Sequence, residues 1–246
     1  MLSLIGKRAF VTGGSRGIGA AIARRLAAEG ADVAIAYEQS ADAAQVIVKE
    51  LLNAGRRAVA IQMDAASPDS IHQAVDRAAA ELGGLDILVN NAGIIRGGPV
   101  ENMSLKDIDD TLAVNVRAVL LASQAALAHL PEGGRIISTG SNLAGRVPDA
   151  GMSLYSMSKA ALIGWTKGLA RDLGPRGITV NIVHPGSTDT DMNPANGPRS
   201  EAQLNRMAIK RYGRAEDVAA LVAFVARDEA RSINGSELTI DGGANA

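Results

Sequence analysis

The sequence predicts a doubly wound α/β fold, in which helices cover both faces of a parallel sheet. Short apolar, strand-forming runs alternate with longer amphipathic stretches along all 246 residues, and this alternation is typical of parallel sheets. The short runs are almost continuously apolar, as expected of strands that are covered on both faces. No linker rich in proline, glycine or serine divides the chain, so we expect residues 1–246 to form one domain.

Seven segments are expected to be strands, and they give a seven-stranded parallel sheet when the crossovers between them are right-handed. Apolar residues, many of them β-branched, dominate each segment. In chain order the expected strands are Arg8–Thr12, Val33–Tyr37, Ala58–Met63, Leu85–Asn90, Arg135–Thr139, Thr179–His184 and Glu237–Ile240.

The connecting segments carry the start and stop signals of helices, namely N-cap serines, a proline in a first turn and a Gly-Pro pair after a last turn. The expected helices are Ala20–Glu29, Ala41–Ala54 after Ser40, a helix starting at Ser67-Pro68, a long segment from Ser104 to about Leu130, and Ser153–Leu173 before Gly174-Pro175. The polar stretch 187–214 is weakly patterned and follows a strand, so we expect it to be a lid over a ligand.

Composition narrows the classes of function. The formal net charge is −1, so no overall positive field draws the chain to nucleic acid or to an anionic membrane. The absence of cysteine excludes disulfides, thiol catalysis and thiolate–zinc sites. His72, His129 and His184 lie far apart in the sequence and lack the spacing of metal ligands, so we expect no metal site.

Neither a targeting segment nor a membrane span is predicted. The first residues contain no long apolar core. The longest apolar-rich stretch, 114–130, includes Asn115, Arg117 and His129 and is too polar to cross a bilayer. We therefore expect a cytoplasmic protein that binds neither membrane nor nucleic acid.

A glycine-rich turn stands between the first expected strand and the first expected helix. It reads Thr12-Gly13-Gly14-Ser15-Arg16-Gly17-Ile18-Gly19. Glycines allow a tight turn and the close approach of a pyrophosphate to the N-terminus of a helix. Glycine also marks ordinary turns, but a position between a first strand and a first helix is the context that a dinucleotide site requires.

The spacing Gly-x-x-x-Gly-x-Gly, together with three further motifs in the same order, resembles the short-chain dehydrogenase/reductase family. These motifs are Asn90-Asn91-Ala92-Gly93, Tyr155-x-x-x-Lys159 and Pro185-Gly186. Asn-Asn and Pro-Gly pairs alone form ordinary turns, but here they stand at the carboxyl ends of strands, where ligands bind in such sheets. The resemblance covers essentially the whole chain, is nearest to 3-oxoacyl-acyl-carrier-protein reductase-like members, and implies a single-domain Rossmann fold.

The resemblance also implies a set of residues for the nicotinamide dinucleotide. Asp64 matches the contact with adenine, and Thr188 and Thr190 match residues that bind the nicotinamide carboxamide. The implied cofactor-binding residues are Gly13, Ser15, Arg16, Gly17, Ile18, Gly19, Tyr37, Asp64, Asn91, Ala92, Gly93, Tyr155, Lys159, Pro185, Gly186, Thr188 and Thr190.

The end of the second strand bears on the choice between NADP(H) and NAD(H). NAD binders place an acid there for the ribose hydroxyls, whereas this chain has Tyr37. Arg16 lies in the glycine turn, and in similar family members this residue meets a 2′-phosphate, which suits a guanidinium. Glu38 either repels that phosphate or points to solvent. The sequence favours NADP(H) and leaves NAD(H) open.

Four residues match the catalytic residues of the family, namely Asn115, Ser141, Tyr155 and Lys159. Reduction of a ketone by hydride needs a proton donor, and a nearby ammonium and an oxidised nicotinamide are expected to lower the pKa of a phenol. The resemblance implies that Tyr155 is the general acid and base, with Lys159 tuning it and binding ribose. It implies that Ser141 holds the substrate oxygen and that Asn115 holds a water linking Lys159 to solvent.

The implied activity is an NAD(P)-dependent dehydrogenase or reductase acting on CH–OH and C=O groups, and three alternatives stand beside it. Asn181–Pro198 resembles a reductase-like cyclic-di-GMP-binding regulatory protein, and the fold alone does not separate binder from enzyme. A 3-oxoacyl-acyl-carrier-protein reductase is another alternative. An epimerase or dehydratase is disfavoured, because those chains usually carry a larger substrate portion.

The expected substrate is a small free ketone or secondary alcohol. An acidic carrier protein needs a basic docking surface, and Glu132 stands where similar carrier-linked reductases place a cation, although Arg176 matches their other basic position. The Ser141-to-Tyr155 interval of 14 residues is one longer than is usual in those reductases, which reshapes the pocket wall.

The partner expected beyond the substrate is the chain itself. The helical faces around Ala118–Leu130 and Leu162–Leu173 are rich in alanine and leucine, and only one side of each helix can face the sheet. The other side either belongs to ordinary core or packs against a second copy. The family resemblance implies a homotetramer.

Overall fold

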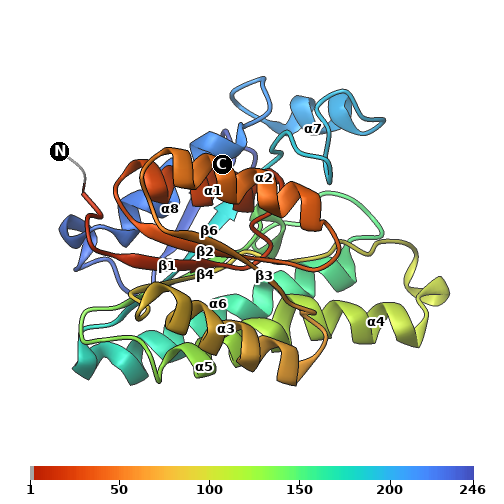
Figure 1. The fold of residues 1–246 in the computed structure, drawn as a ribbon. Coiled ribbons are helices and arrows are strands. Elements are labelled where there is room, and N and C mark those ends of the chain that lie inside the picture. Colours follow the sequence, from red (N-terminus) through yellow and green to blue (C-terminus); the bar gives the residue numbers. More distant parts are fainter. Residues whose placement is uncertain (1–2) are drawn as a thin grey trace.

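Seven parallel strands form one sheet in the order β3-β2-β1-β4-β5-β6-β7 in the computed structural model, which describes residues 3–246 (Figure 1). The order reverses between β1 and β4, where a doubly wound sheet opens a crevice for ligands. The strands are β1 Arg8–Val11, β2 Asp32–Tyr37, β3 Ala58–Gln62, β4 Ile87–Asn90, β5 Arg135–Thr139, β6 Thr179–Pro185 and β7 Glu237–Ile240.

Helices cover both faces of the sheet, as the apolar strands require (Figure 1). One face packs against α1 Gly17–Ala28, α2 Ala41–Asn53 and α8 Ala215–Ala226. The other packs against α3 Pro68–Leu82, α5 Ala118–Ala126 and α6 Ser153–Leu173, and α4 Leu105–Leu112 extends this layer. The predicted fold class, a doubly wound seven-stranded parallel sheet with helices on both faces, is confirmed.

Local signals account for several element boundaries. The Ser67 hydroxyl accepts a hydrogen bond from the Ser70 N–H at 3.4 Å, and Pro68 occupies the first turn of α3. The Ser104 hydroxyl caps α4 by accepting from the Asp107 N–H at 3.0 Å. Helix α6 has the predicted bounds.

The long helix expected from Ser104 to about Leu130 is instead two helices. A π-helical turn, Ala113–Arg117, separates α4 from α5, and α5 ends at Ala126. Sequence periodicity does not reveal this turn, because one π turn shifts the register of a helix without a glycine or proline to mark it. Helix α8 also lies outside the expected elements, although a crossover between the parallel strands β6 and β7 requires it.

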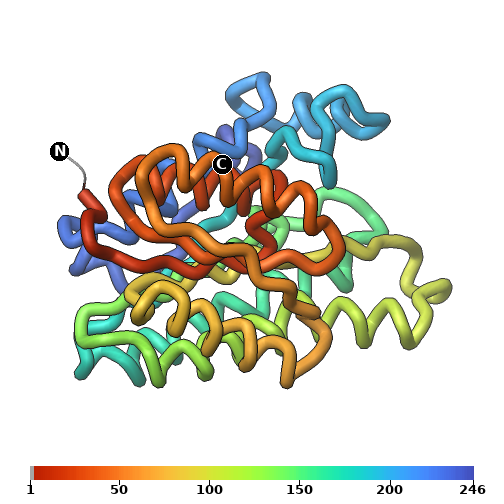
Figure 2. Tube along the Cα trace, in the orientation of Figure 1, coloured from red at the N-terminus to blue at the C-terminus, as the bar shows by residue number. Residues whose placement is uncertain are grey.

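Residues 187–214, which we call the lid after their predicted role, rise beyond the sheet between β6 and α8 (Figure 2). It contains one short helix, α7 Ser200–Arg206, and lies above the loop that follows β5 (Figures 1 and 2). Within residues 3–246, no helix is long and apolar enough to cross a membrane.

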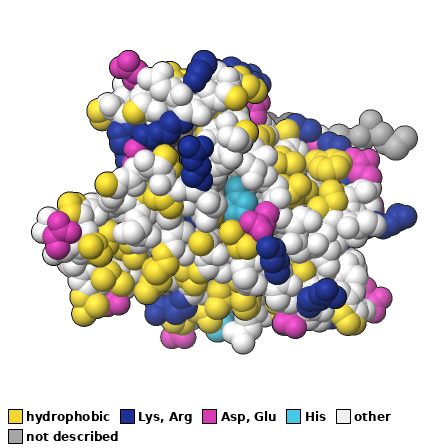
Figure 3. All heavy atoms as spheres, turned by 180° about the vertical axis from the view of Figure 1, so that it is seen from behind, with side chains coloured by type: hydrophobic (Ala, Val, Ile, Leu, Met, Phe, Trp, Pro, Cys, Tyr) yellow, Lys and Arg dark blue, Asp and Glu magenta, His cyan; other side chains and the backbone are white. Residues whose placement is uncertain are grey.

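Large apolar side chains are exposed on the helices of the lower layer. Leu105 of α4 is 72% exposed and Met157 of α6 is 50% exposed. Figure 3, turned by half a revolution from Figure 1, shows hydrophobic side chains spread over the region where these helices lie. An apolar surface of this kind is typical of a face that packs against another protein.

Candidate active site

A cavity of about 800 Å³ opens at the carboxyl ends of the central strands. Its walls come from the loops after the six strands β1 to β6, which is where ligands bind in open parallel sheets. All seventeen residues predicted to bind the cofactor line this cavity, and so does Ser141. The sequence prediction therefore names positions that share one site although they come from most of the chain.

The turn after β1 forms a cradle that only glycine permits at two positions. Gly17 has a positive φ of 53°, which disfavours other residues. A Cβ on Gly19 would lie 2.1 Å from the Gly13 carbonyl oxygen. The Asn91 side chain holds this turn by donating to the Thr12 and Gly13 carbonyls, at 3.0 and 3.2 Å. Backbone N–H groups at the start of α1 are thus open to a phosphate, so the cradle fits a dinucleotide.

The adenosine end of the cavity contains both charges that the sequence singled out. Arg16 and Glu38 are exposed and line the cavity together with Tyr37 and Asp64. Arg16 is the N-cap residue of α1, and its side chain makes no capping bond. Asp64 Oδ1 accepts from the Ala66 N–H at 2.8 Å, so this carboxylate also shapes its own turn.

Tyr155 and Lys159 lie one turn apart on α6, and both side chains face the cavity. Lys159 Nζ is 5.9 Å from the centre of the Tyr155 ring and donates to the Thr139 carbonyl at 3.0 Å. Ser141 follows β5, and its hydroxyl oxygen accepts from the Leu143 N–H at 3.2 Å. Because that bond uses a lone pair, the hydroxyl hydrogen of Ser141 stays available to donate to a substrate oxygen.

Burial controls the protonation of both α6 residues. It raises the pKa of Tyr155, and the Ser141 hydroxyl lowers that pKa by a smaller amount. Burial lowers the pKa of Lys159 from 10.5 to about 8. Desolvation of the phenolate outweighs the hydrogen bond from Ser141, and a lowering of the phenol pKa by the ammonium and an oxidised nicotinamide stays a prediction.

Asn115 lies in the π-helical turn, behind the cavity wall rather than on it. Its Oδ1 accepts from the Ile94 N–H at 2.8 Å, and its Nδ2 donates to the Ile94 carbonyl at 2.9 Å and to Ser158 Oγ at 3.0 Å. Both N–H donors of the amide are therefore engaged with protein groups, and Oδ1 keeps one lone pair. A water relay at this residue would have to use that lone pair or the backbone carbonyl.

The segment after β6 brings the remaining predicted residues to the cavity. Pro185 ends β6 and Gly186 follows it. Thr188 is buried, and its hydroxyl donates to the Gly186 carbonyl at 3.1 Å. The Thr190 methyl group would lie 3.5 Å from a Cβ on Gly17. Thr190 therefore joins the lid to the glycine cradle.

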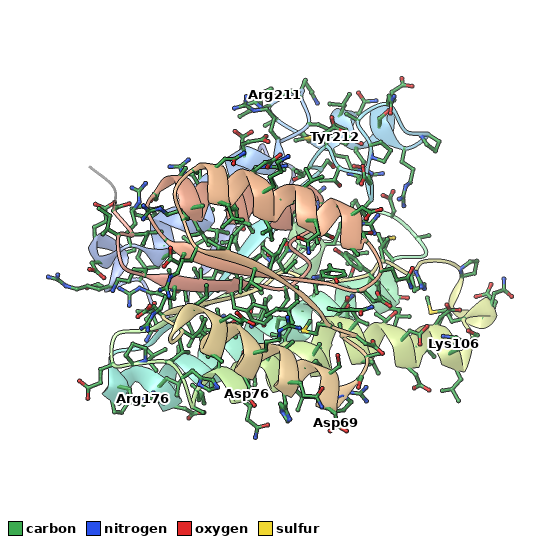
Figure 4. All side chains as sticks on the ribbon, in the orientation of Figure 1. Asp69, Asp76, Lys106, Arg176, Arg211 and Tyr212 are labelled. Atoms are coloured by element: carbon green, nitrogen blue, oxygen red, sulfur yellow. The ribbon has the colours of Figure 1, made fainter. Side chains whose placement is uncertain are left out.

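The lid is braced by side-chain contacts within itself and with the loop before α6. Asn193 and Gln203 exchange two hydrogen bonds of 3.0 and 3.1 Å, and the Tyr212 hydroxyl donates to Gln203 at 3.0 Å. Arg206 on α7 forms a two-bond ion pair with Asp149, and both line the cavity. Figure 4 shows Tyr212 in the lid and Lys106, another lining residue, at the far end of α4.

Sequence reasoning missed the contribution of the last residues. Ala244 and Asn245 line the cavity. Asn245 Nδ2 donates to the Asn142 carbonyl at 2.6 Å, and Arg146 donates to the Ala244 carbonyl at 3.1 Å. No sequence motif predicts these contacts, because they join segments about a hundred residues apart.

No group of three or more His, Asp or Glu side chains suited to a metal ion occurs within the described residues 3–246. The arrangement is instead a phosphate cradle, a buried ammonium, a phenol and a hydroxyl around one cavity. These groups can hold a dinucleotide, bind an oxygen atom and exchange a proton with it.

Known proteins resemble this chain over nearly its whole length. A family profile described as Enoyl-(Acyl carrier protein) reductase matches residues 13–245. The chain is 46% identical over 246 residues, and all of both chains, to the cyclic-di-GMP-binding biofilm dispersal mediator protein of Escherichia coli. It is 38% identical over 240 residues to a Staphylococcus aureus 3-oxoacyl-[acyl-carrier-protein] reductase, with 96% of this chain and 97% of that one covered.

A solved structure is similar at higher identity. It is a short chain dehydrogenase from Burkholderia cenocepacia in complex with NADP, with a TM-score of 0.98 and 72% identity. The match covers 99% of this chain and 100% of that one.

Proposed function

The chain belongs to the short-chain dehydrogenase/reductase family, and from this premise we propose that it is an NADP(H)-dependent oxidoreductase acting on a carbonyl or secondary alcohol. The observation that carries the proposal is that Ser141, Tyr155 and Lys159 line the same cavity as the glycine cradle. A protein that only binds a nucleotide has no need of a phenol, a hydroxyl and a buried ammonium in that arrangement.

The residues present fit a bound NADP(H). The backbone of the glycine turn would hold the pyrophosphate, Arg16 the 2′-phosphate, Lys159 the ribose hydroxyls, and Thr188 and Thr190 the carboxamide. The cofactor, when bound, supplies or accepts the hydride. The remaining tasks of the reaction fall to residues of the protein.

The protein's own part is positioning and proton transfer. The Ser141 hydroxyl donates to the substrate oxygen and holds the carbonyl against Tyr155. In reduction, the Tyr155 hydroxyl gives its proton to the oxygen on which negative charge develops, and in oxidation it takes that proton back. The phenol is protonated at neutral pH and therefore has a proton to give, although its raised pKa makes it a weaker acid in the absence of the cofactor.

The choice of NADP(H) over NAD(H) rests on the adenosine end of the cavity. Tyr37 stands where an NAD binder places an acid. The Arg16 side chain lines the cavity and makes no capping hydrogen bond with α1, so its guanidinium could meet a phosphate. The Burkholderia cenocepacia relative was solved with NADP, which supports the same choice. Glu38 also lines the cavity, and its carboxylate opposes this choice.

A small free ketone or secondary alcohol remains the proposed substrate. Arg176, which matches a basic docking position of carrier-linked reductases, donates to the Leu127 carbonyl at 3.4 Å and to the Leu130 carbonyl at 2.6 Å. Its guanidinium is therefore engaged with backbone after α5. Figure 4 shows Arg176 and the cavity residue Lys106 at opposite ends of the molecule. Glu132 adds no cation to this region.

The direct test compares kcat/KM for acetoacetyl groups on an acyl carrier protein with kcat/KM for linear and cyclic ketones, using nicotinamide absorbance. We expect free ketones to be preferred. A strong preference for the carrier-bound substrate would overturn the substrate assignment, and turnover of neither class would overturn the proposed activity.

Cyclic-di-GMP binding is a second candidate, favoured by the 46% identity to the Escherichia coli mediator protein. Arg199 and Arg206 of the lid line the cavity, and guanidinium groups suit phosphates. Titration with NADPH, NADH and cyclic-di-GMP separates the candidates. If cyclic-di-GMP binds and displaces NADPH while no ketone or alcohol is turned over, the chain is a binding protein.

A further inference from the structure

A buried histidine stands directly behind Ser141, and the mechanism above does not use it. His184 lies near the end of β6 and is 4% exposed. Its Nδ1 is 3.1 Å from the Ser141 backbone nitrogen and 2.8 Å from the Ser141 carbonyl oxygen. Gly140 makes room for the ring, because a Cβ there would lie 2.5 Å from Nδ1.

The surrounding hydrogen bonds identify the tautomer. The Ser141 carbonyl already accepts from the Ala144 N–H at 3.0 Å. The Ser141 N–H points at Nδ1 with hydrogen-bond geometry, and leaving a buried N–H without an acceptor is costly. The Ser141 N–H has an acceptor only when Nδ1 carries no hydrogen, which places the hydrogen on Nε2. This tautomer brings the lone pairs of Nδ1 and the Ser141 carbonyl within 2.8 Å, a smaller cost than a buried N–H without an acceptor.

The other ring nitrogen faces a charged pair. Nε2 is buried, makes no hydrogen bond within residues 3–246, and lies 3.7 Å from Glu237 Oε2 on β7. Glu237 is in turn paired with Lys167 of α6 at 2.6 Å. A carboxylate on this side favours the Nε2–H tautomer and thereby leaves Nδ1 as the acceptor.

We propose that His184 is a positioning residue, whose neutral imidazole accepts from the Ser141 N–H and so fixes the backbone that aims the Ser141 hydroxyl at the substrate oxygen. This inference rests on the proposed oxidoreductase function. An apolar residue would fill the same space without an unsatisfied nitrogen, so the imidazole is explained by its contact with Ser141 rather than by packing.

Protonation of His184 would reverse this contact. An imidazolium has two donors and no acceptor. Its Nδ1–H could no longer accept from the Ser141 N–H and would donate to the Ser141 carbonyl instead. Burial lowers the pKa of His184, and the charge of Lys159 lowers it further, while the charge of Glu237 and the bond that a protonated Nδ1 would donate to the Ser141 carbonyl raise it. The charged or titratable groups near the ring are Glu237, Lys159 and Lys167, with Tyr155 beyond Ser141. The neutral form is therefore held at neutral pH and lost in acid.

The test uses two variants that keep or remove an acceptor at the Nδ1 position. Asparagine offers its side-chain oxygen there, and leucine offers nothing. We expect His184→Leu to lower kcat about tenfold, the effect of one lost buried hydrogen bond, with NADPH affinity changed less than about twofold. His184→Asn should stay within about threefold of the native kcat. Equal losses in both variants, or a parallel loss of NADPH affinity, would overturn the proposal.

A double variant shows whether His184 acts through Ser141. In the Ser141→Ala background, His184→Leu should cause little further loss, because the group that it positions is gone. Additive losses would contradict the proposal.

A pH profile tests the effect of protonating His184. The fall in kcat at acidic pH should disappear in His184→Asn and persist in His129→Asn, which alters a more exposed histidine paired with Asp76. If kcat still falls at acidic pH in His184→Asn, the fall is not caused by protonation of His184.

A readout without substrate separates this inference from the proposed function. The ring ¹⁵N chemical shifts of the native protein, assigned with the His184→Asn and His129→Asn variants, should show His184 as the Nε2–H tautomer. An Nδ1–H tautomer would overturn the inference even if ketones are reduced. If no ketone or alcohol is turned over, the proposed function fails while the tautomer result still stands.

Discussion

Arg206 of the lid and Asp149 of the loop before α6 form a two-bond ion pair across the mouth of the cavity. Their side chains are 31% and 47% exposed, so water screens the pair and its contribution to stability is small. The position of the pair matters more than its contribution to stability, because the pair joins the one helix of the lid, α7, to the loop that forms the opposite wall of the cavity.

We expect Arg206→Ala to raise KM for the ketone by roughly threefold to tenfold, because loss of the pair releases the lid. The free energy of unfolding should change by less than about 1 kcal/mol. Steady-state kinetics and urea unfolding measure the two effects. Exchange of the charges in Arg206→Asp with Asp149→Arg should recover part of KM, and an unchanged KM in Arg206→Ala would show that the pair does not hold the lid.

Replacing Tyr155 by phenylalanine removes the proton donor and keeps the ring. We expect turnover to fall by roughly 10² or more, the effect of a lost general acid. NADPH binding, followed by nicotinamide fluorescence, should be retained. Turnover near the native value would refute the assignment of Tyr155 as acid and base.

Lys159→Met should abolish most turnover and yet stabilise the fold at pH 7. The lowered pKa of about 8 means that charging the buried amine costs the folded state about 3 kcal/mol. The hydrogen bond to the Thr139 carbonyl offsets about 1 kcal/mol of this, so a net gain of about 2 kcal/mol is expected on substitution.

The pH dependence of that gain checks its origin. Between pH 8 and 10.5 the unfolded chain binds the proton that the folded protein has released, so the native protein becomes more stable as pH rises. The advantage of Lys159→Met should therefore be largest below pH 8 and shrink above it. Urea unfolding at pH 7 and pH 9.5 measures this, and a pH-independent difference would contradict the electrostatic explanation.

Arg16→Ala should weaken NADPH binding more than NADH binding, because only NADPH carries the 2′-phosphate that suits the guanidinium. Fluorescence titration with both cofactors measures the ratio. Glu38→Gln is the matched variant and should strengthen NADPH binding. A native preference for NADH would show that Glu38 dominates the adenosine end of the site.

The family resemblance leads us to expect a homotetramer, and the exposed apolar surface of α4 and α6 offers a face on which copies could pack. Sedimentation at micromolar concentration should give four times the 25.3 kDa mass of the chain. Met157→Lys places a charge on α6 at a half-exposed position and should dissociate the assembly if that face is an interface. A monomeric native protein would refute this expectation.

The parts of the site that could be predicted from the sequence are those that local spacing specifies. Tyr155 and Lys159 share a cavity because residues four apart on a helix face the same way. The glycine turn could be recognised because it needs a positive φ at Gly17 and no side chain at Gly19. The strands could be predicted because each is apolar enough to be buried on both faces.

Contacts between distant segments could not be predicted in this way. His184 and Ser141 are 43 residues apart, and they meet because β5 and β6 are neighbours in the sheet. Arg206 and Asp149 are 57 residues apart, and Asn245 meets Asn142 across 103 residues. None of these pairs leaves a periodic signal, since each depends on which elements pack together.

The sequence by itself therefore determined the class of fold, the cradle for a dinucleotide and the phenol–ammonium pair, because each follows from backbone preference or helical spacing. Only the tertiary structure decided how these residues are tuned. Packing buried Lys159 and Tyr155 and shifted their pKa values in opposite directions, and it placed an imidazole behind Ser141. Desolvation and hydrogen bonding depend on what surrounds a group in space, and a residue's neighbours in space are fixed only when the chain has folded.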